Sequence, residues 1–350
     1  MKKFLIKLSY TVLPVWLLLV GLATYLWMTD DNSGDLMRLG LIDGGQEYTD
    51  SISGLALPQV YYAGEDNDSV LRLSSCDVLV IGDSFSHGGG VGKVGDYVNY
   101  LAHDGNLDVT VFTPQDPTLT SPLQLAYDVL NLGSIDSSRV RNLVVQEVER
   151  YIVDRHNGFV TSHKSIPLPP ERLQSGDDGE QEAQENPSAG PLMRVKDYIF
   201  YHLFGANPIY KARLSRPLFG GKEPAMLYFY NEDVKNGIQI PDESQQRIKE
   251  NYSQLIDKAR EKGVNLIILI ACDKYDLYQD FIVDNSYPEK TLNEDIAQWM
   301  AADTSCFVFS KQVLHPLVKK GIKDVYLFND THWSPSSSRI IAQEIINKLK

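Results

Sequence analysis

The chain alternates between short, continuous apolar runs and longer segments in which apolar residues recur at helical spacing. The apolar runs are rich in β-branched residues, which is typical of strands buried on both faces. They lie at 77–81, 109–112, 143–145, 265–270, 306–309 and 325–328. The segments with helical spacing lie at about 92–104, 121–132, 244–262, 291–301 and 336–349. This alternation predicts a three-layer α/β/α fold with a mainly parallel sheet.

An insertion interrupts the alternation between about residues 155 and 243. Within it, residues 167–191 are rich in Pro, Gly, Ser, Glu and Gln, which predicts a mobile linker. Many aromatic side chains follow at 192–230, and they favour a helical cap or lid over the sheet; an insertion packed away from the chemistry is the alternative. We expect one domain over 75–350 that carries this insertion, preceded by a spacer and entry segment over 30–74.

The N-terminus predicts a membrane anchor over residues 1–29. Lys2, Lys3 and Lys7 precede an uncharged run from Leu8 to Met28, which is long enough to cross a bilayer as a helix. Lysines before the run place the N-terminus in the cytoplasm and the domain outside, in the periplasm or beyond the cell. A cleaved signal peptide is the alternative, and it would export the domain as well.

Composition narrows the partners and cofactors. The formal net charge of −13 argues against a nucleic-acid partner, which requires a basic face. The three cysteines, Cys76, Cys272 and Cys306, are odd in number and widely spaced, so neither a disulfide framework nor a zinc site is indicated. We expect buried free thiols at strand ends, with at most one bridged pair, and no metal or cofactor.

A candidate nucleophile follows the first predicted strand, in the segment Gly82-Asp83-Ser84-Phe85-Ser86. A serine at the carboxyl end of a buried strand lies at the edge where open α/β sheets bind ligands, and backbone N–H groups of the turn can stabilise an oxyanion there. A G-x-S-x-G elbow is excluded because position 86 is Ser. A phosphate-binding loop anchored at Gly92-Lys93 also fails, because its first glycine position holds a histidine.

A candidate base and its orienting acid lie before the last predicted helix, at Asp330 and His332. A carboxylate two residues from a histidine can hold the Nδ1 proton and stabilise the imidazolium. Helix capping by Asp330 or Ser334 is a second interpretation, and it does not exclude the first. Because loops at the carboxyl ends of parallel strands meet at one edge of the sheet, we expect Ser84, His332 and Asp330 to form a catalytic triad.

These residues resemble those of a known family. Gly82-Asp83-Ser84-Phe85-Ser86 looks like the first block of SGNH hydrolases, and Asp330-Thr331-His332-Trp333 resembles the last block in its alginate O-acetyltransferase (AlgX/AlgJ-type) group. The stretches 144–150 and 271–278 look similar to two further segments of that group. The Gly-x-Asn-Asp block of other SGNH enzymes is missing from the sequence, and the loop at 113–121 lacks the expected oxyanion glycine.

The resemblance implies an SGNH-type serine enzyme outside the cytoplasmic membrane. Ser84 would be the nucleophile, and it would pass an acetyl group to a hydroxyl of an exported polysaccharide. A multi-spanning membrane O-acyltransferase that supplies acetyl groups is the implied partner. Further candidates for oxyanion or substrate contacts are Asp83, Arg150, Lys274 and Trp333.

Two rival functions stay open at the level of the sequence. The same triad could hydrolyse acetyl esters of a glycan, since the sequence does not distinguish water from sugar as the acceptor. A non-catalytic glycan-binding subunit of an export complex is a rival of another class, although such a protein would be expected to have lost Ser84 or His332.

Overall fold

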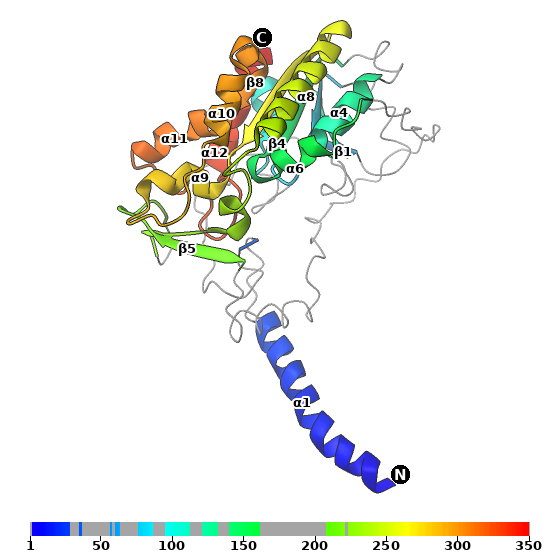
Figure 1. Cartoon of the computed structure of the whole chain (residues 1–350), viewed down its shortest axis with the longest axis vertical. Coiled ribbons are helices and arrows are strands. Elements are labelled where there is room, and N and C mark those ends of the chain that lie inside the picture. Colours follow the sequence, from blue (N-terminus) through cyan, green and yellow to red (C-terminus); the bar gives the residue numbers. More distant parts are fainter. Residues whose placement is uncertain are drawn as a thin grey trace.

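A parallel β-sheet forms the centre of the protein in the computed structural model, which describes residues 2–28, 35–36, 57, 60–63, 76–86, 95–112, 121–131, 140–161, 208–220 and 223–349. The sheet has six strands in the order β1-β3-β2-β4-β7-β8, and every neighbouring pair is parallel (Figure 1). The strands are β1 (Tyr61–Ala63), β2 (Val78–Ile81), β3 (Val109–Phe112), β4 (Asn142–Val148), β7 (Asn265–Ala271) and β8 (Phe307–Phe309).

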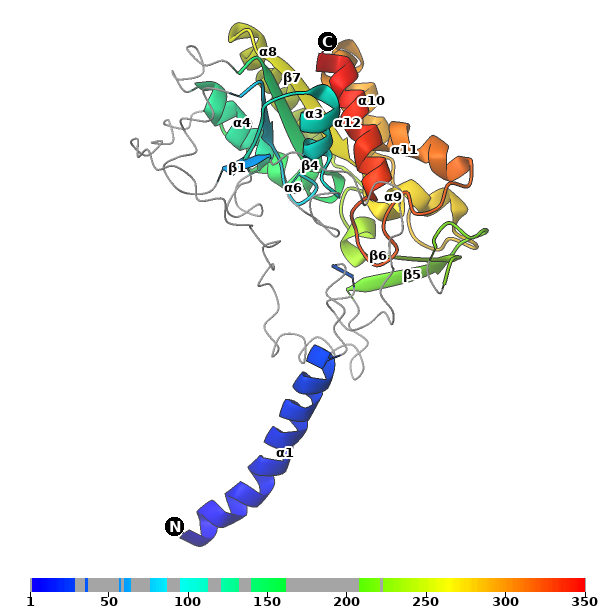
Figure 2. The same cartoon turned by 180° about the vertical axis from the view of Figure 1, so that it is seen from behind.

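Helices cover both faces of this sheet, as Figure 2 shows from behind. They are α3 (Tyr97–Gly105), α4 (Pro122–Asn131), α6 (Ile152–Asn157), α8 (Asp242–Glu261), α9 (Lys274–Tyr278), α10 (Leu292–Trp299), α11 (Ser310–Lys319) and α12 (Pro335–Leu349). Short 3-10 helices are η3 (Glu149–Tyr151), η4 (Asn231–Val234), η5 (Gln279–Phe281) and η6 (Ala301–Cys306).

Two hydrophobic cores lie on opposite sides of the sheet. Alternate residues of each strand enter alternate cores: Val78 and Val80 pack with α3 and α12, whereas Leu79 and Ile81 pack with α4 and α8. Because both faces are covered, the strands read as continuous apolar runs rather than as alternating ones. The predicted α/β/α architecture with a mainly parallel sheet is therefore confirmed.

The described part of the aromatic insertion is a β-hairpin, so the predicted helical cap is wrong there. Strands β5 (Ile209–Arg213) and β6 (Met226–Tyr230) pair antiparallel. Side chains along β6 alternate between buried and half-buried, which is the two-residue period of a strand with one face on the core. Aromatic residues favour this pleated, half-buried surface. The predicted mobile linker 167–191 lies outside the described residues.

The run at 325–328, predicted as the last strand, is not part of the sheet. Its residues are buried, but their backbone pairs with the chain just downstream. The N–H of Leu327 donates to the carbonyl of His332 at 3.0 Å, and that of Ser334 donates to the carbonyl of Val325 at 3.0 Å. An apolar run reports burial and does not identify the partner of the backbone. The last strand of the sheet is β8.

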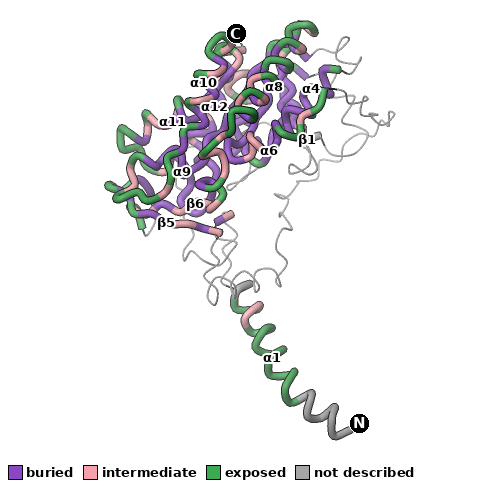
Figure 3. Tube along the Cα trace, in the orientation of Figure 1, coloured by how far each residue is buried: buried purple, intermediate pink, exposed green. Residues whose placement is uncertain are grey.

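The N-terminal helix α1 (Lys2–Met28) is present and stands apart from the α/β domain (Figure 1). Its described side chains, from Tyr10 to Tyr25, are mostly exposed, including large apolar ones such as Leu18 (Figure 3). Within the described part of the chain, however, no helix combines the length and apolar character needed to cross a membrane. The transmembrane helix expected at 1–29 is therefore not supported.

Two smaller expectations can also be compared with the structure. The segment over 30–74, predicted as a spacer and entry segment, contributes the edge strand β1 to the sheet. All three cysteines are free thiols; Cys76 and Cys272 are buried and Cys306 is half-buried. Burial raises the pKa of the Cys76 thiol, as expected for a thiol that fills core space and is not reactive.

Candidate active site

Ser84, His332 and Asp330 form one hydrogen-bonded chain at the carboxyl edge of the sheet. The hydroxyl of Ser84 lies 2.8 Å from His332 Nε2, and His332 Nδ1 lies 2.5 Å from Asp330 Oδ1. Ser84 follows β2, in the middle of the sheet, and the other two residues lie in the loop before α12. Ser84 is exposed, whereas Asp330 is buried. The structure thus brings together the three residues predicted as a triad, although 248 positions separate Ser84 from His332.

The charges of this chain are arranged for proton transfer. Burial opposes protonation of His332, but attraction and hydrogen bonding from Asp330 outweigh it and raise the pKa of the imidazole. Burial likewise opposes ionisation of Asp330, yet the attraction of His332 lowers the pKa of that carboxyl group. A buried carboxylate that stabilises an imidazolium, with a serine hydroxyl on the other ring nitrogen, can perform acyl transfer.

The turn that carries Ser84 is held by Gln146, from β4. The side-chain Oε1 of Gln146 accepts the backbone N–H of Asp83 at 3.0 Å and the hydroxyl of Ser86 at 2.9 Å. Gly82 permits this close approach, because a Cβ there would meet Ser86 Oγ at 2.2 Å and Gln146 Oε1 at 2.7 Å. Gly88-Gly89-Gly90 and most of the 113–121 loop lie outside the described residues.

Asp83 faces the interior and does not line the reacting side of Ser84. It is 5% exposed, and its Oδ2 lies 3.1 Å from the guanidinium of Arg155, from α6. The predicted oxyanion or substrate role of Asp83 therefore does not fit its position. A buried ion pair of this kind fixes the turn through charge-assisted hydrogen bonds.

Arg150 also lies inside a network of charges. Its guanidinium lies 2.6 Å from Asp273, which follows β7, and 3.4 Å from Asp233, which belongs to η4 after the hairpin. Because Arg150 itself follows β4, these ion pairs connect the ends of β4 and β7 to η4. Burial works against its charge, but these two carboxylates raise the pKa of Arg150. The guanidinium also lies over the rings of Tyr151 and Tyr230. These contacts indicate that Arg150 holds three segments together, in place of the predicted substrate contact.

Lys274 lies behind the loop that carries Asp330 and His332. Its ammonium group donates to the carbonyls of Leu327 at 2.6 Å, Phe328 at 2.8 Å and Asp330 at 2.9 Å, and the side chain is fully buried. Burial lowers the pKa of Lys274 to about 7, against the attraction of nearby carboxylates. The predicted oxyanion or substrate role is therefore wrong, since the head group contacts the underside of the loop.

Trp333 is buried and also supports the site from inside. Its ring packs edge-on against Phe85, with ring centroids 4.5 Å apart, and against Tyr97 at 6.2 Å. Phe85 in turn contacts the ring of His332 at 4.5 Å. The residue after the base and the residue after the nucleophile thus pack on each other, which fixes the two loops relative to one another.

Three supporting residues had no role assigned from the sequence: Asp35, Gln146 and Arg155. Gln146 lies within the stretch 144–150 that carried part of the family resemblance, so its position directly after the predicted strand at 143–145 was a usable signal. Asp35 had none, because it stands in a polar segment about 300 residues before its partners. Its carboxylate accepts the backbone N–H of Thr331 at 2.8 Å and the hydroxyl of the same residue.

Asp35, Asp330 and His332 are the group in the described residues whose ligand atoms lie close enough for a metal ion, within 4.8 Å of one another. These atoms are already hydrogen-bonded to one another or to Thr331. This pattern favours proton transfer through His332 over metal binding.

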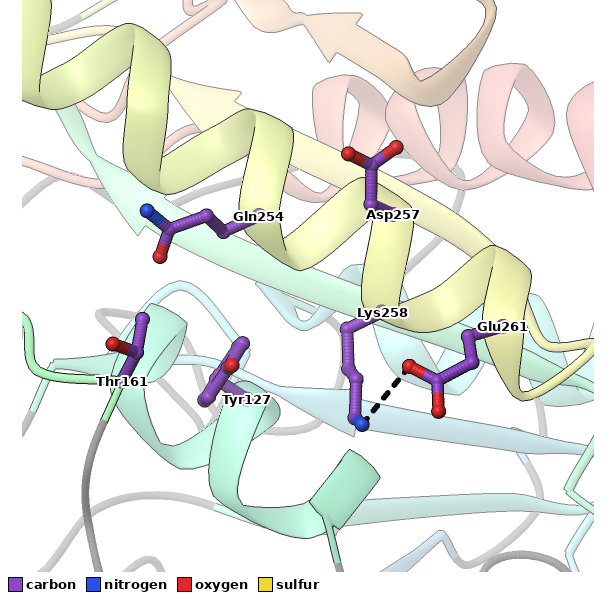
Figure 4. A pocket seen from close by; sticks show the side chains of 6 residues that line it. All are labelled: Tyr127, Thr161, Gln254, Asp257, Lys258 and Glu261. Carbon is purple, nitrogen blue, oxygen red and sulfur yellow. Dashed lines mark hydrogen bonds and ion pairs between the residues drawn. The ribbon is translucent and has the colours of Figure 1, made fainter.

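A shallow hollow of about 410 Å³ lies elsewhere, between α4 and α8 (Figure 4). It is lined by Tyr127, Thr161, Gln254, Asp257, Lys258 and Glu261. Since α8 ends where β7 begins, this hollow belongs to the amino edge of the sheet, opposite the Ser84 site. Lys258 and Glu261 form an ion pair in the lining of this hollow, and neither the hollow nor the ion pair contacts the Ser84 site.

Fold and site together define an α/β protein with a serine–histidine–aspartate arrangement at the carboxyl edge of its sheet. Residues 227–350 match the family described as the SGNH hydrolase-like domain of acetyltransferase AlgX. The chain is also 28% identical, over 151 residues, to a probable alginate O-acetylase AlgJ of Pseudomonas fluorescens. That alignment covers 39% of this chain and 36% of the relative, so the chain spans about a third of the relative's length.

No solved structure matches the chain at a significant level. The resemblance to the AlgX/AlgJ-type group, predicted from four short segments, is confirmed by both similarities. Residues 227–350 contain Asp330 and His332 and do not contain Ser84, so the role of Ser84 as the nucleophile rests on its sequence motif and on its position beside His332.

Proposed function

We propose that the protein is an SGNH-type O-acetyltransferase that acetylates hydroxyl groups of an exported polysaccharide through an acetyl-Ser84 intermediate. The observation that carries the proposal is the hydrogen-bonded chain from Ser84 through His332 to Asp330. The similarity of residues 227–350 to an acetyltransferase family favours transfer over hydrolysis.

In the first half of the reaction, His332 Nε2 takes the hydroxyl proton of Ser84 while Oγ attacks the carbonyl carbon of the acetyl donor. Collapse of the tetrahedral intermediate breaks the bond to the donor, and His332 returns the proton to the leaving group. Asp330 keeps Nδ1 protonated and stabilises the imidazolium throughout.

In the second half, His332 takes the proton of an acceptor hydroxyl, whose oxygen attacks acetyl-Ser84. Collapse of the second intermediate releases the acetyl ester and restores the proton to Ser84 Oγ. With water in place of the sugar the products are acetate and free enzyme, so an acetylesterase is the rival function. The buried support of the loops keeps Ser84 and His332 aligned in both halves.

The partners and the place of action are part of the proposal. An exported acceptor requires the Ser84 site to lie outside the cytoplasm, and the lysines followed by an apolar run at the N-terminus support export. The relative from Pseudomonas fluorescens carries the name of an alginate O-acetylase, which supports a polysaccharide acceptor. A multi-spanning membrane O-acyltransferase that supplies acetyl groups is the proposed partner. Fractionation of cells that express the chain tests export directly.

The decisive experiment follows p-nitrophenol release from p-nitrophenyl acetate by the full-length chain, with and without oligosaccharide acceptors. The wild type is compared with Ser84→Ala and with Ser253→Ala, an exposed serine on α8, as the matched control. We expect loss of activity in Ser84→Ala alone, one added acetyl group on the intact protein during turnover, and acetylated sugar among the products. Acetate without acetylated sugar would favour the esterase. A folded wild type with no turnover would favour the non-catalytic glycan-binding subunit.

A further inference from the structure

Asp35, which precedes the α/β domain in the sequence, contacts the loop that carries Asp330 and His332. Its backbone N–H donates to Asp330 Oδ2 at 2.9 Å, and its carboxylate accepts the N–H of Thr331 at 2.8 Å and the Thr331 hydroxyl. The next residue, Leu36, is fully buried in the core and donates its N–H to the carbonyl of Asn329 at 3.2 Å. Two consecutive residues thus form a short clip along the backbone of the loop at 329–331.

The clip determines how Asp330 is oriented. One oxygen of Asp330, Oδ1, accepts both the ring Nδ1–H of His332 and the backbone N–H of the same residue at 2.9 Å. The other oxygen, Oδ2, accepts the N–H of Asp35. With both oxygens occupied, the carboxylate cannot rotate away from the imidazole without losing a buried hydrogen bond.

Asp35 also places a second carboxylate beside His332. Its Oδ2 lies 4.0 Å from the Nδ1 atom of His332. Burial and the neighbouring charge of Asp330 raise the pKa of Asp35, while Thr331 stabilises its ionised form. The other charged groups that act on His332 and this loop are Asp330 itself, Lys274 behind the loop, and Arg150, whose positive charge opposes protonation of His332.

We propose that Asp35 is a positioning residue of the Ser84 site: it fixes the orientation of Asp330 and adds negative charge beside His332. The proposal rests on the proposed function, because it concerns the alignment of the same triad. Asp35 and Leu36 are therefore part of the functional unit, although they lie about 300 residues before Asp330 in the sequence.

The first test is Asp35→Asn in the full-length chain, with Asp257→Asn on the exposed face of α8 as the matched control. The backbone N–H of Asp35 that contacts Asp330 stays in this variant, but the carboxylate that holds Thr331 and adds charge beside His332 is replaced. We therefore expect kcat for p-nitrophenyl acetate to fall about 10- to 100-fold with KM little changed, since no substrate contact is lost. The acid limb of the kcat/KM profile should move to lower pH, because one carboxylate no longer favours the imidazolium. Wild-type kcat and an unmoved profile in Asp35→Asn would overturn the proposal.

Two further measurements keep the test decisive. Thr331→Val removes a side-chain partner of Asp35 and keeps the carboxylate, so kcat should fall several-fold even if Asp35→Asn does not fold; a kcat within twofold of wild type would then overturn the proposal. NMR titration of the His332 ring needs no turnover. If Ser84→Ala shows that the proposed function fails, a lower His332 pKa in Asp35→Asn still supports the placement of Asp35, and an unchanged pKa refutes it.

Discussion

Replacing Lys274 by methionine tests whether the loop that carries Asp330 and His332 depends on the hydrogen bonds that Lys274 donates to its carbonyls. Methionine keeps the apolar stem of the side chain and removes an ammonium group that donates to three carbonyls at 2.6–2.9 Å. Each buried carbonyl left without a donor costs about 1–3 kcal/mol. Because burying an ammonium group itself costs several kcal/mol, part of this loss is offset. We expect a net destabilisation of about 3 kcal/mol.

The same substitution should damage catalysis more than stability alone explains. Loosening of the carbonyls at 327, 328 and 330 lets Asp330 and His332 shift, and a displacement of about 1 Å can lower kcat about 100-fold. Urea unfolding followed by circular dichroism gives the free energy of unfolding, and p-nitrophenyl acetate hydrolysis gives kcat. Lys311→Met is the matched control: Lys311 is a largely buried lysine paired with Asp276 and Glu294, so its loss should lower stability and spare kcat.

The pH dependence of Lys274→Met adds an independent test. Burial lowers the pKa of Lys274 from 10.5 to about 7, so the folded protein binds fewer protons than the unfolded chain between these values. Stability of the wild type therefore gains from this group as the pH rises from about 7 towards 10.5, and the variant lacks the gain. The difference in unfolding free energy should widen over that range. Parallel pH curves together with wild-type kcat in the variant would refute the reasoning.

Three more predictions follow from the geometry. His332 must be neutral to act as a base, so kcat/KM should fall as the pH falls through its raised pKa, above the ordinary 6.5; an inflection below 6.5 would contradict this. Gly82→Ala places a Cβ 2.2 Å from Ser86 Oγ and should lower both stability, by about 1–3 kcal/mol, and kcat, whereas Gly158→Ala, whose nearest contact is 3.7 Å, should not; calorimetry and kinetics compare them. Burial and Asp273 raise the pKa of Asp233 from 3.8 to about 7, so the contribution of this group to stability falls as the pH rises between these values. Asp233→Asn should therefore flatten the plot of unfolding free energy against pH over that range. An unchanged slope of this plot would contradict the prediction.

The sheet was readable from the sequence because its strands are buried on both faces. Runs such as 78–81 and 265–271 are short, apolar and β-branched, so burial and strand propensity indicate the same structure. The run at 325–328 is as deeply buried, yet it pairs with residues 332–334 of its own loop. Local composition does not distinguish the two cases, since only the position of the pairing partner differs. Helix α11 was missed for another reason: Pro316 lies inside it, and proline is a poor indicator of a helix interior.

The sequence predicted only those residues of the candidate site whose role can be read from their own type and their immediate neighbours. Ser84, Asp330 and His332 stand out because each follows or precedes a regular element with the residue types that acyl transfer needs. The directions of Asp83, Arg150, Lys274 and Trp333 were not predictable, because a residue next to a reactive one can face either the substrate or the interior. Asp35 illustrates the limit, since its role depends on contacts with residues 295 and 296 positions away.

The clip at Asp35 also limits the distance between α1 and the loop that carries His332. Asp35 follows Met28, the last residue of α1, by seven positions, and a fully extended chain of that length spans at most about 25 Å. The carboxyl end of α1 is therefore held within about 25 Å of Asp35, which contacts the loop that carries His332. A molecule that binds this end of α1 would therefore have a high effective concentration near Ser84.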